Sequence, residues 1–177
     1  MPTLILAQDP SKNLIPVEVD ADGVLKIVSQ DEVFEVTLSL DTNAYADGDV
    51  LAATQELDGA AFTEDGGKAI LQNVQVIDFD DQAQALDIVL LRSNVAIGTE
   101  NSAVSVTDAN VDEIVAIVEV ATDDYVDLVN SQIAEVANIG KIIEAASSDD
   151  GLYIAAISRG TGTYTASGIT VRVGLLR

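Results

Sequence analysis

The residues best suited to chemistry in this sequence are carboxylates, and the first group of them resembles a calcium loop. Oxygen-bearing side chains stand at alternate positions from Asp41 through Asn43, Tyr45 and Asp47 to Asp49. An EF-hand loop places Gly at its sixth position and a bidentate Glu at its twelfth, whereas this segment has Ala46 and Ala52 there. The pattern therefore excludes an EF-hand, and both another kind of calcium site and a solvated loop between strands stay open.

Three other acidic groups could supply the paired carboxylates of a glycoside hydrolase. They are Asp78 with Asp80 and Asp81, Asp123 with Asp124, and Asp149 with Asp150. A sugar-cleaving site also needs aromatic platforms, and 4 Tyr and 3 Phe must serve both the core and the surface. We therefore expect these acids to form turns and to solubilise the surface, and we predict no catalytic residue.

The segment Gly160-Thr161-Gly162-Thr163 superficially resembles a phosphate-binding loop. It lacks the following Lys-Ser/Thr and the strand-to-helix context that such a loop needs, so we predict a turn. The basic residues are scattered singly along the chain: Lys12, Lys26, Lys68, Arg92, Lys141, Arg159, Arg172 and Arg177. Arg92 and Arg159 each follow an apolar run, where we expect each of them to pair with a carboxylate. We expect these arginines to be used at a subunit contact.

Composition excludes several classes of function. The 177 residues contain 30 Asp and Glu against 8 Lys and Arg, a formal net charge of −22, with no His, Cys or Trp. Such a chain is repelled by nucleic acid and by anionic lipid, so we predict neither as a partner. Zinc sites of the usual type, cysteine nucleophiles and Ser-His-Asp triads all lack a necessary residue. We predict no cofactor, no metal and no enzymatic activity.

The elements that must position these residues are predicted to be strands. Apolar residues form 48% of the chain, and 50 of its residues are Val, Ile or Thr, which favour strands. Phe34, Val36, Leu38 and Leu40 alternate with polar residues, which indicates one buried face of a strand. The apolar run Leu86 to Leu91 indicates a central strand that is buried on both faces.

Further short strands are predicted along the chain, together with one helix. The strands are Val50 to Thr54, Lys68 to Phe79, Tyr125 to Leu128, Ile133 to Ala137, Lys141 to Ala146, Leu152 to Ser158 and Ile169 to Leu176. A short helix capped by Asp108 is expected to lead into a strand over Ile114 to Val120. The predicted fold is all-β, a jelly-roll-like β-sandwich with an N-terminal arm and at most one short helix.

Two regions are expected within the chain. Pro2, Pro10 and Pro16 fall in the first 16 residues, which favours an extended arm or hairpin over residues 1–32, and an edge strand of the main sheet is the alternative. Residues 33–177 are expected to form the sandwich. No run approaches a membrane span, and the opening residues lack the features of a signal peptide.

Several segments resemble a group of uncharacterised bacteriophage structural proteins. They are Ala69-Ile70-Leu71-Gln72, Asp87 to Leu91, Tyr153 to Tyr164 and Gly168 to Gly174. Small acidic virion proteins with such segments are similar to capsid decoration or cement proteins. The resemblance covers roughly residues 33 to 177 and implies a virion part that works through its surfaces, without site residues to transfer.

Two functional hypotheses follow. The first is a decoration protein that binds between major capsid proteins on the capsid surface of a phage head, as a homotrimer. A mean hydropathy of +0.28 is high for a soluble monomer and supports self-association. The alternative is a carbohydrate-binding or host-attachment module of a phage tail or fibre, because jelly rolls also serve lectins. An exposed aromatic platform would distinguish the second hypothesis from the first.

Overall fold

The computed structural model describes residues 6–8, 14–16, 31–57 and 61–177. The chain forms two units, Met1–Gln30 and Asp31–Arg177. In the first unit, β1 (Leu6–Gln8) pairs antiparallel with β2 (Leu14–Pro16). Most of the predicted arm lies outside the described residues, including Pro2 and Pro10. The predicted boundary after residue 32 and the role of the arm therefore stay predictions.

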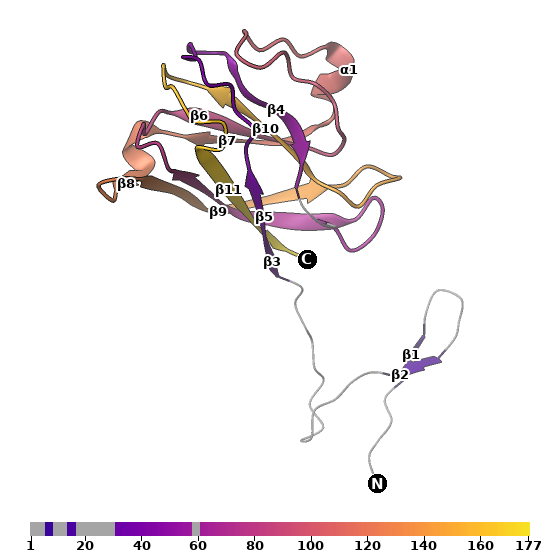
Figure 1. Cartoon of the computed structure of the whole chain (residues 1–177). Helices are drawn as coiled ribbons and strands as arrows, with labels where there is room; N and C mark the ends of the chain where they lie inside the picture. The colour runs from indigo at the N-terminus through magenta and orange to yellow at the C-terminus, as the bar shows by residue number, and fades with distance from the viewer. Residues whose placement is uncertain (1–5, 9–13, 17–30, 58–60) are drawn as a thin grey trace. The chain divides into compact units, whose positions relative to one another are not determined.

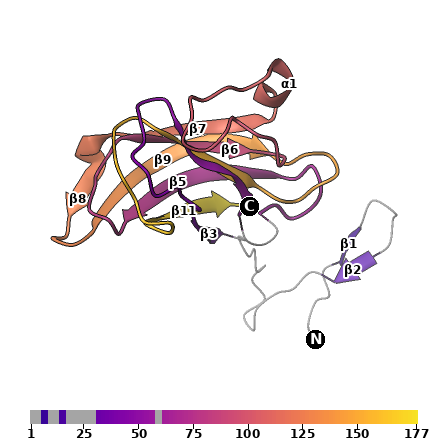
Figure 2. The same ribbon diagram turned by 45° about the horizontal axis from the view of Figure 1, so that its top comes forward.

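The second unit is a sandwich of two antiparallel sheets, which form two layers (Figures 1 and 2). The five-stranded sheet has the order β3, β11, β5, β9, β8. Its strands are β3 (Glu32–Thr37), β5 (Lys68–Asp78), β8 (Tyr125–Asp127), β9 (Gln132–Glu144) and β11 (Ile169–Leu176). The four-stranded sheet has the order β4, β10, β6, β7. Its strands are β4 (Val50–Glu56), β6 (Leu86–Leu91), β7 (Ile114–Val120) and β10 (Tyr153–Ser158).

The pairing of these strands is that of a jelly roll. Strands pair from the middle of the unit outward, β6 with β7, β5 with β9, β4 with β10, and β3 with β11. The long antiparallel ribbon formed by these four pairs is then wrapped, so that β11 also pairs with β5 and β10 with β6. Eight strands wrapped in this way into two sheets define the jelly-roll architecture, and β8 is added at an edge. The predicted fold class is confirmed.

The main core lies between the two sheets because strand residues alternate between an inner and an outer face. Phe34, Leu38 and Leu40 are buried there as predicted, and Val36 packs against them from a partly buried position. Strand β3 ends at Thr37, but backbone bonds continue the pairing: Leu38 N donates to Ile169 O (2.9 Å) and Leu40 N to Ala166 O (3.1 Å).

A second apolar cluster covers part of the outer face of the four-stranded sheet. Its buried members are Val50, Val89, Leu91, Ile97, Ala155 and Ile157. Ile97 belongs to the β6–β7 connection, residues 92–113, which contains the short helix α1 (Asp108–Val111) and lies over this layer (Figure 1). Strand β6 is therefore buried along its whole length, with Leu86, Ile88 and Leu90 in the main core. The prediction that β6 is central is confirmed.

Two local predictions need correction. The cap of α1 (Asp108–Val111) is Thr107 rather than Asp108, because Thr107 has an extended backbone and its hydroxyl accepts from Asn110 N. The two strands predicted over Ile133 to Ala137 and Lys141 to Ala146 are one strand, β9. A bulge interrupts it where Asn138 (φ 59°) and Gly140 (φ 66°) adopt left-handed conformations.

The helices of the described residues are short. A 3-10 turn, η1 (Thr122–Asp124), precedes β8, and α1 has 4 residues. Neither is long or apolar enough to cross a membrane.

Candidate functional site

The wrapped ribbon gathers three polar connections at one end of the sandwich. They are the β3–β4 segment (residues 38–49), the β5–β6 turn (79–85) and the β10–β11 loop (159–168). Backbone and side-chain bonds join them: Tyr45 N donates to Gly162 O (3.0 Å), and Thr161 N donates to Gln84 Oε1 (3.1 Å). Most polar motifs singled out in the sequence therefore lie at this end, which we call the loop end.

Asp78 organises the β5–β6 turn. Its carboxylate is buried, with 1% of the residue exposed, and accepts three backbone hydrogen bonds. Asp80 N donates to Oδ1 at 2.9 Å, and Gln82 N and Ala83 N each donate to Oδ2 at 2.8 Å. A carboxylate so fully engaged with backbone donors builds a turn, as predicted.

Asp80 links that turn to the β10–β11 loop. Its Oδ2 accepts from Thr165 N at 2.7 Å and from Thr165 Oγ1 at 3.0 Å. The third acid of the group, Asp81, accepts a hydrogen bond from Gln132 Nε2 at 2.9 Å. Both carboxylates therefore hold loops together.

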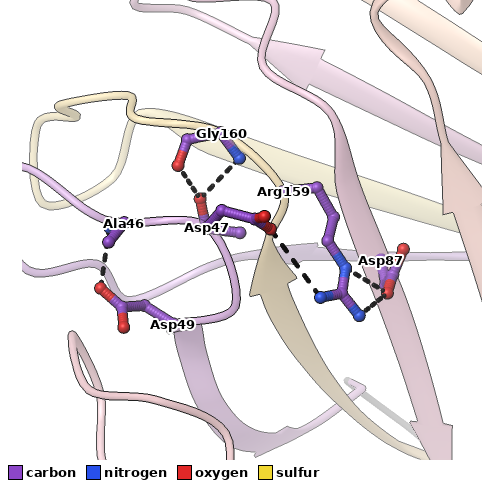
Figure 3. A network of polar contacts seen from close by, with 7 residues as sticks. Ala46, Asp47, Asp49, Asp87, Arg159 and Gly160 are labelled. Atoms are coloured by element: carbon purple, nitrogen blue, oxygen red, sulfur yellow. Dashed lines mark hydrogen bonds and ion pairs between the residues drawn. The ribbon is translucent and has the colours of Figure 1, made fainter.

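Arg159 forms the strongest charged contact of the loop end (Figure 3). Its Nε and Nη2 both donate to Asp87 Oδ2, at 2.8 and 2.6 Å. Its Nη1 lies 3.9 Å from Asp47 Oδ1 in the β3–β4 segment. The hydrogen bond to Asp87 raises the pKa of Arg159 above its usual value. The predicted carboxylate partner of this arginine lies within the chain.

An open pocket of ≈ 390 Å³ adjoins this pair. Asp87, Glu119 and Arg159 line it together with Ala85, Val120 and Ala121. Asp87 and Glu119 are register partners on β6 and β7, so two acids stand side by side on the outer face of the four-stranded sheet. The positive charge of Arg159 offsets the repulsion between Asp87 and Glu119, and its Nε and Nη2 both bond to the Asp87 carboxylate.

The calcium-like segment uses its oxygens for local structure. Asp41 Oδ1 accepts from Asn43 N (2.7 Å) and Asn43 Nδ2 (2.6 Å), and these bonds lower the pKa of Asp41. Asp49 Oδ2 accepts from Ala46 N at 2.8 Å (Figure 3). Tyr45 is buried, with its ring 6.2 Å from that of Tyr164, and its hydroxyl accepts a hydrogen bond from Asp41 N at 2.7 Å. The described residues contain no group of three acidic, His or Cys side chains placed to hold a metal ion.

The remaining acid pairs also stabilise turns. Asp124 Oδ2 accepts from Ala121 N (2.9 Å) at the start of η1. Asp149 accepts from Gly151 N and from Tyr153 OH, both at 2.8 Å. These two bonds lower the pKa of Asp149, and the hydrogen bond that Tyr153 donates to Asp149 raises the pKa of Tyr153 to about 12.

The glycine-rich segment was predicted to be a turn, and in the structure it is a bend at Gly160 followed by an irregular part of the β10–β11 loop. A Cβ at Gly160 would lie 2.2 Å from Gln84 Oε1, and a Cβ at Gly162 would lie 2.8 Å from the Tyr164 ring. A side chain at either position would have to displace Gln84 or Tyr164, so this segment packs closely against its neighbours.

Arg92 pairs with a carboxylate at the other end of the sandwich. Its Nε donates to Glu113 Oε2 at 3.2 Å, and Ser93 Oγ donates to the same oxygen at 2.7 Å. Both bonds lower the pKa of Glu113. Like Arg159, Arg92 is engaged inside its own chain, so the predicted use of these two residues at a subunit contact stays untested.

Sequence reasoning missed Asp87 and Glu119 and the glutamines Gln55, Gln82 and Gln84. Asp87 is the one charge within the run Leu86 to Leu91, and that isolation is a signal for a buried ion pair. The glutamines bond backbone groups of distant loops, such as Gln55 Nε2 with Thr37 O at 3.0 Å. Their sequence positions carry no comparable signal.

No protein-family model matches the chain, and no curated protein matches it in sequence. A structure of desmodium yellow mottle tymovirus is 14% identical with a TM-score of 0.27, covering 97% of this chain and 93% of that chain. The VP2 subviral particle of infectious bursal disease virus is 11% identical with a TM-score of 0.19, covering 99% of this chain and 46% of that chain. The assignment of the fold therefore rests on the strand order itself.

Proposed function

We propose that this chain is a structural virion protein, a decoration or cement protein that binds between major capsid proteins on the surface of a bacteriophage head. The observation that supports this most is the jelly-roll strand order, an architecture that recurs in viral capsid and lectin domains. Because a fold alone does not determine function, the use of the polar side chains must support the same conclusion.

The loop end supports a protein that works through its surface. Asp78, Asp80 and Arg159 all bond to groups of their own chain, which fixes the loops in place. A decoration protein needs such a rigid scaffold and needs no reactive group. The proposal accordingly includes no catalytic residue, cofactor or metal.

The assembly state belongs to the same proposal. The apolar composition favours self-association, and a homotrimer is the state we propose. A formal net charge of −22 limits uncontrolled aggregation and keeps the chain from adhering to nucleic acid. These properties suit a protein that assembles on the outside of a particle.

A lectin-like role is the second candidate, because the same architecture occurs in lectins. Carbohydrate sites use exposed aromatic platforms, and all seven aromatic residues of this chain fall within residues 31–177. Phe79 is 54% exposed, whereas Phe34, Tyr45, Phe62 and Tyr164 are buried. A single exposed ring at the end of β5 favours the decoration role over a sugar platform.

Particle binding tests the proposal. Heads of the phage that encodes this chain, prepared without it, should bind the purified chain in a saturable manner when the two are sedimented together. Electron cryomicroscopy of the loaded heads should place the added density between capsid subunits. If the heads do not bind the chain while a glycan array does, the lectin-like role replaces the proposed one.

A further inference from the structure

The two outer faces of the sandwich differ in how their apolar side chains are covered. Part of the outer face of the four-stranded sheet is covered by the β6–β7 connection, where Val89, Leu91 and Ile157 are buried in one cluster with Ile97. The outer face of the five-stranded sheet carries exposed apolar side chains instead. These belong to every strand of that sheet: Val33 (63% exposed), Ile70 (39%), Val126 (62%), Ile142 (68%) and Leu176 (38%). Phe79, which directly follows β5, adds a further exposed ring.

Three of these residues form one continuous row. Ile70 of β5 stands in register with Ile142 of β9 on one side and with Leu176 of β11 on the other. Residues in register on neighbouring strands have their side chains in contact distance on the same face. The row borders a shallow pocket of ≈ 310 Å³ that Lys68 and Ala69 also line. Contiguous exposed apolar surface of this kind marks an interaction site.

The same face is almost neutral in a strongly acidic chain. Its outward-facing charged residues are Glu35, Lys68, Glu135, Glu144 and Arg172, two basic and three acidic, a formal charge of −1. Arg172 Nε lies 2.6 Å from Glu35 Oε2, and Lys68 Nζ lies 3.6 Å from Glu144 Oε2. The whole chain carries −22, so most of its negative charge lies on other surfaces.

The charge distribution distinguishes between occupants of this face. A basic partner gains most by binding acidic surface, whereas a second copy of this chain is repelled there and finds the least repulsion on a neutral face. We propose that the outer face of the five-stranded sheet, centred on Ile70, Ile142 and Leu176, is the surface through which copies of this chain contact one another. This inference rests on the proposed self-association and is independent of the capsid role.

The rim of the row suits such a contact. Lys68 and Glu144 are 64% and 55% exposed in their side chains and provide both signs of charge beside Ile142. Each copy presents both signs of charge, so neighbouring copies of the proposed trimer can place Lys68 opposite Glu144 without a net excess of either sign. The remaining repulsion between two acidic chains acts over a longer range and is screened by salt.

Sedimentation equilibrium of the whole chain, with the variants Ile142→Lys and Ile117→Lys, tests the inference. Ile117 is the matched control, because it is 53% exposed on the outer side of β7 in the other sheet. Lys at position 142 would be desolvated in the contact, so we expect dissociation to be at least about tenfold easier. Ile117→Lys should leave the oligomer unchanged. Added salt should strengthen association of the unmodified chain.

The outcomes separate this inference from the proposed function. A chain that remains monomeric at all concentrations overturns both the self-association and the contact face. An oligomer that tolerates Ile142→Lys and Ile70→Lys overturns the contact face alone. If the Lys variant does not fold, Ile142→Thr replaces it, because Thr keeps the β-branched shape. Self-association of Ile142→Thr should also be weaker than that of the unmodified chain. Head binding, measured separately, tests the capsid role.

Discussion

Arg159 and Asp87 are joined through a single carboxylate oxygen, since Nε and Nη2 of the arginine both donate to Asp87 Oδ2. The two side chains differ in exposure, 42% for Arg159 and 11% for Asp87. The carboxylate is thus the buried partner, and it stands beside Glu119 in the register of β6 and β7. The arginine compensates for an acid that the fold has placed in the sheet.

Replacing Arg159 by Met should therefore destabilise the fold by about 2 kcal/mol, because it leaves a nearly buried carboxylate unpaired. Asp47→Asn is the matched control. Asp47 is 75% exposed and 3.9 Å from the same guanidinium, so its loss should cost less than about 1 kcal/mol. Urea denaturation of both variants gives the comparison. Equal losses would show that Arg159 stabilises the chain through something other than Asp87.

The β3 segment provides a second contrast between neighbouring residues. Leu38 is fully buried, so Leu38→Ala should cost about 2 to 5 kcal/mol through lost burial and a residual cavity. Thr37 is exposed, but its Oγ1 lies 2.9 Å from Oγ1 of the buried Thr170, so Thr37→Ala should cost about 1 kcal/mol. Denaturant midpoints measure both. A larger loss for Thr37→Ala than for Leu38→Ala would reverse the assignment of the two faces.

Periodic features of the sequence predicted much of the sandwich. Phe34, Leu38 and Leu40 alternate with polar residues, and the run Leu86 to Leu91 has no solvent-facing position, so local pattern was enough to indicate their burial. The bulge of β9 could not be recognised. Asn138 and Gly140 are residues that also end strands in turns, and only pairing with β5 on both sides makes the segment continuous.

The sequence predicted that acidic residues of the loop end form turns, but it did not predict which residues of distant segments contact one another. Asp78 was expected to form a turn, and it bonds residues two to five positions ahead, within the reach of local patterns. Arg159 and Asp87 are 72 positions apart and meet because β10 and β6 pair. Contacts of that range depend on topology, which composition and spacing leave undetermined.

The turn between β8 and β9 offers a stabilising change. Val129 has a φ of 80°, a left-handed conformation that costs an L-residue about 1 to 2 kcal/mol and suits Gly in two-residue hairpin loops. Its side chain is 78% exposed, so little packing is lost on its removal. Val129→Gly should raise the free energy of unfolding by about 0.5 to 1 kcal/mol, after the entropy cost of Gly. A thermal melt of the variant measures the gain.

Asn130→Gly is the control for that change. Asn130 lies outside the left-handed region, so Gly there adds chain entropy without relieving strain and should lower stability. If both variants lose stability, the conformation of Val129 carries no strain that Gly can relieve.

The hydrogen bond from Tyr153 OH to Asp149 Oδ2 lies in the β9–β10 connection, and it should make the stability of the chain depend on pH. The pKa of Asp149 is lowered in the fold, so its stabilising effect is complete above the unfolded pKa of about 3.9 and is lost as pH falls through the lower folded value. The pKa of Tyr153 is raised to about 12, so its effect is complete below the unfolded pKa of about 10 and is lost as pH rises through about 12.

Asp149→Asn should therefore cost about 1 kcal/mol at neutral pH, where the charged acceptor is present, and progressively less below about pH 4. Tyr153→Phe removes the donor of the same bond and should show the same decline toward acid. Urea denaturation of both variants and the unmodified chain, at neutral pH and near pH 3, measures the differences in unfolding free energy. A cost for Asp149→Asn that is the same at both pH values would mean that the Asp149 charge does not stabilise the turn through Tyr153 and Gly151.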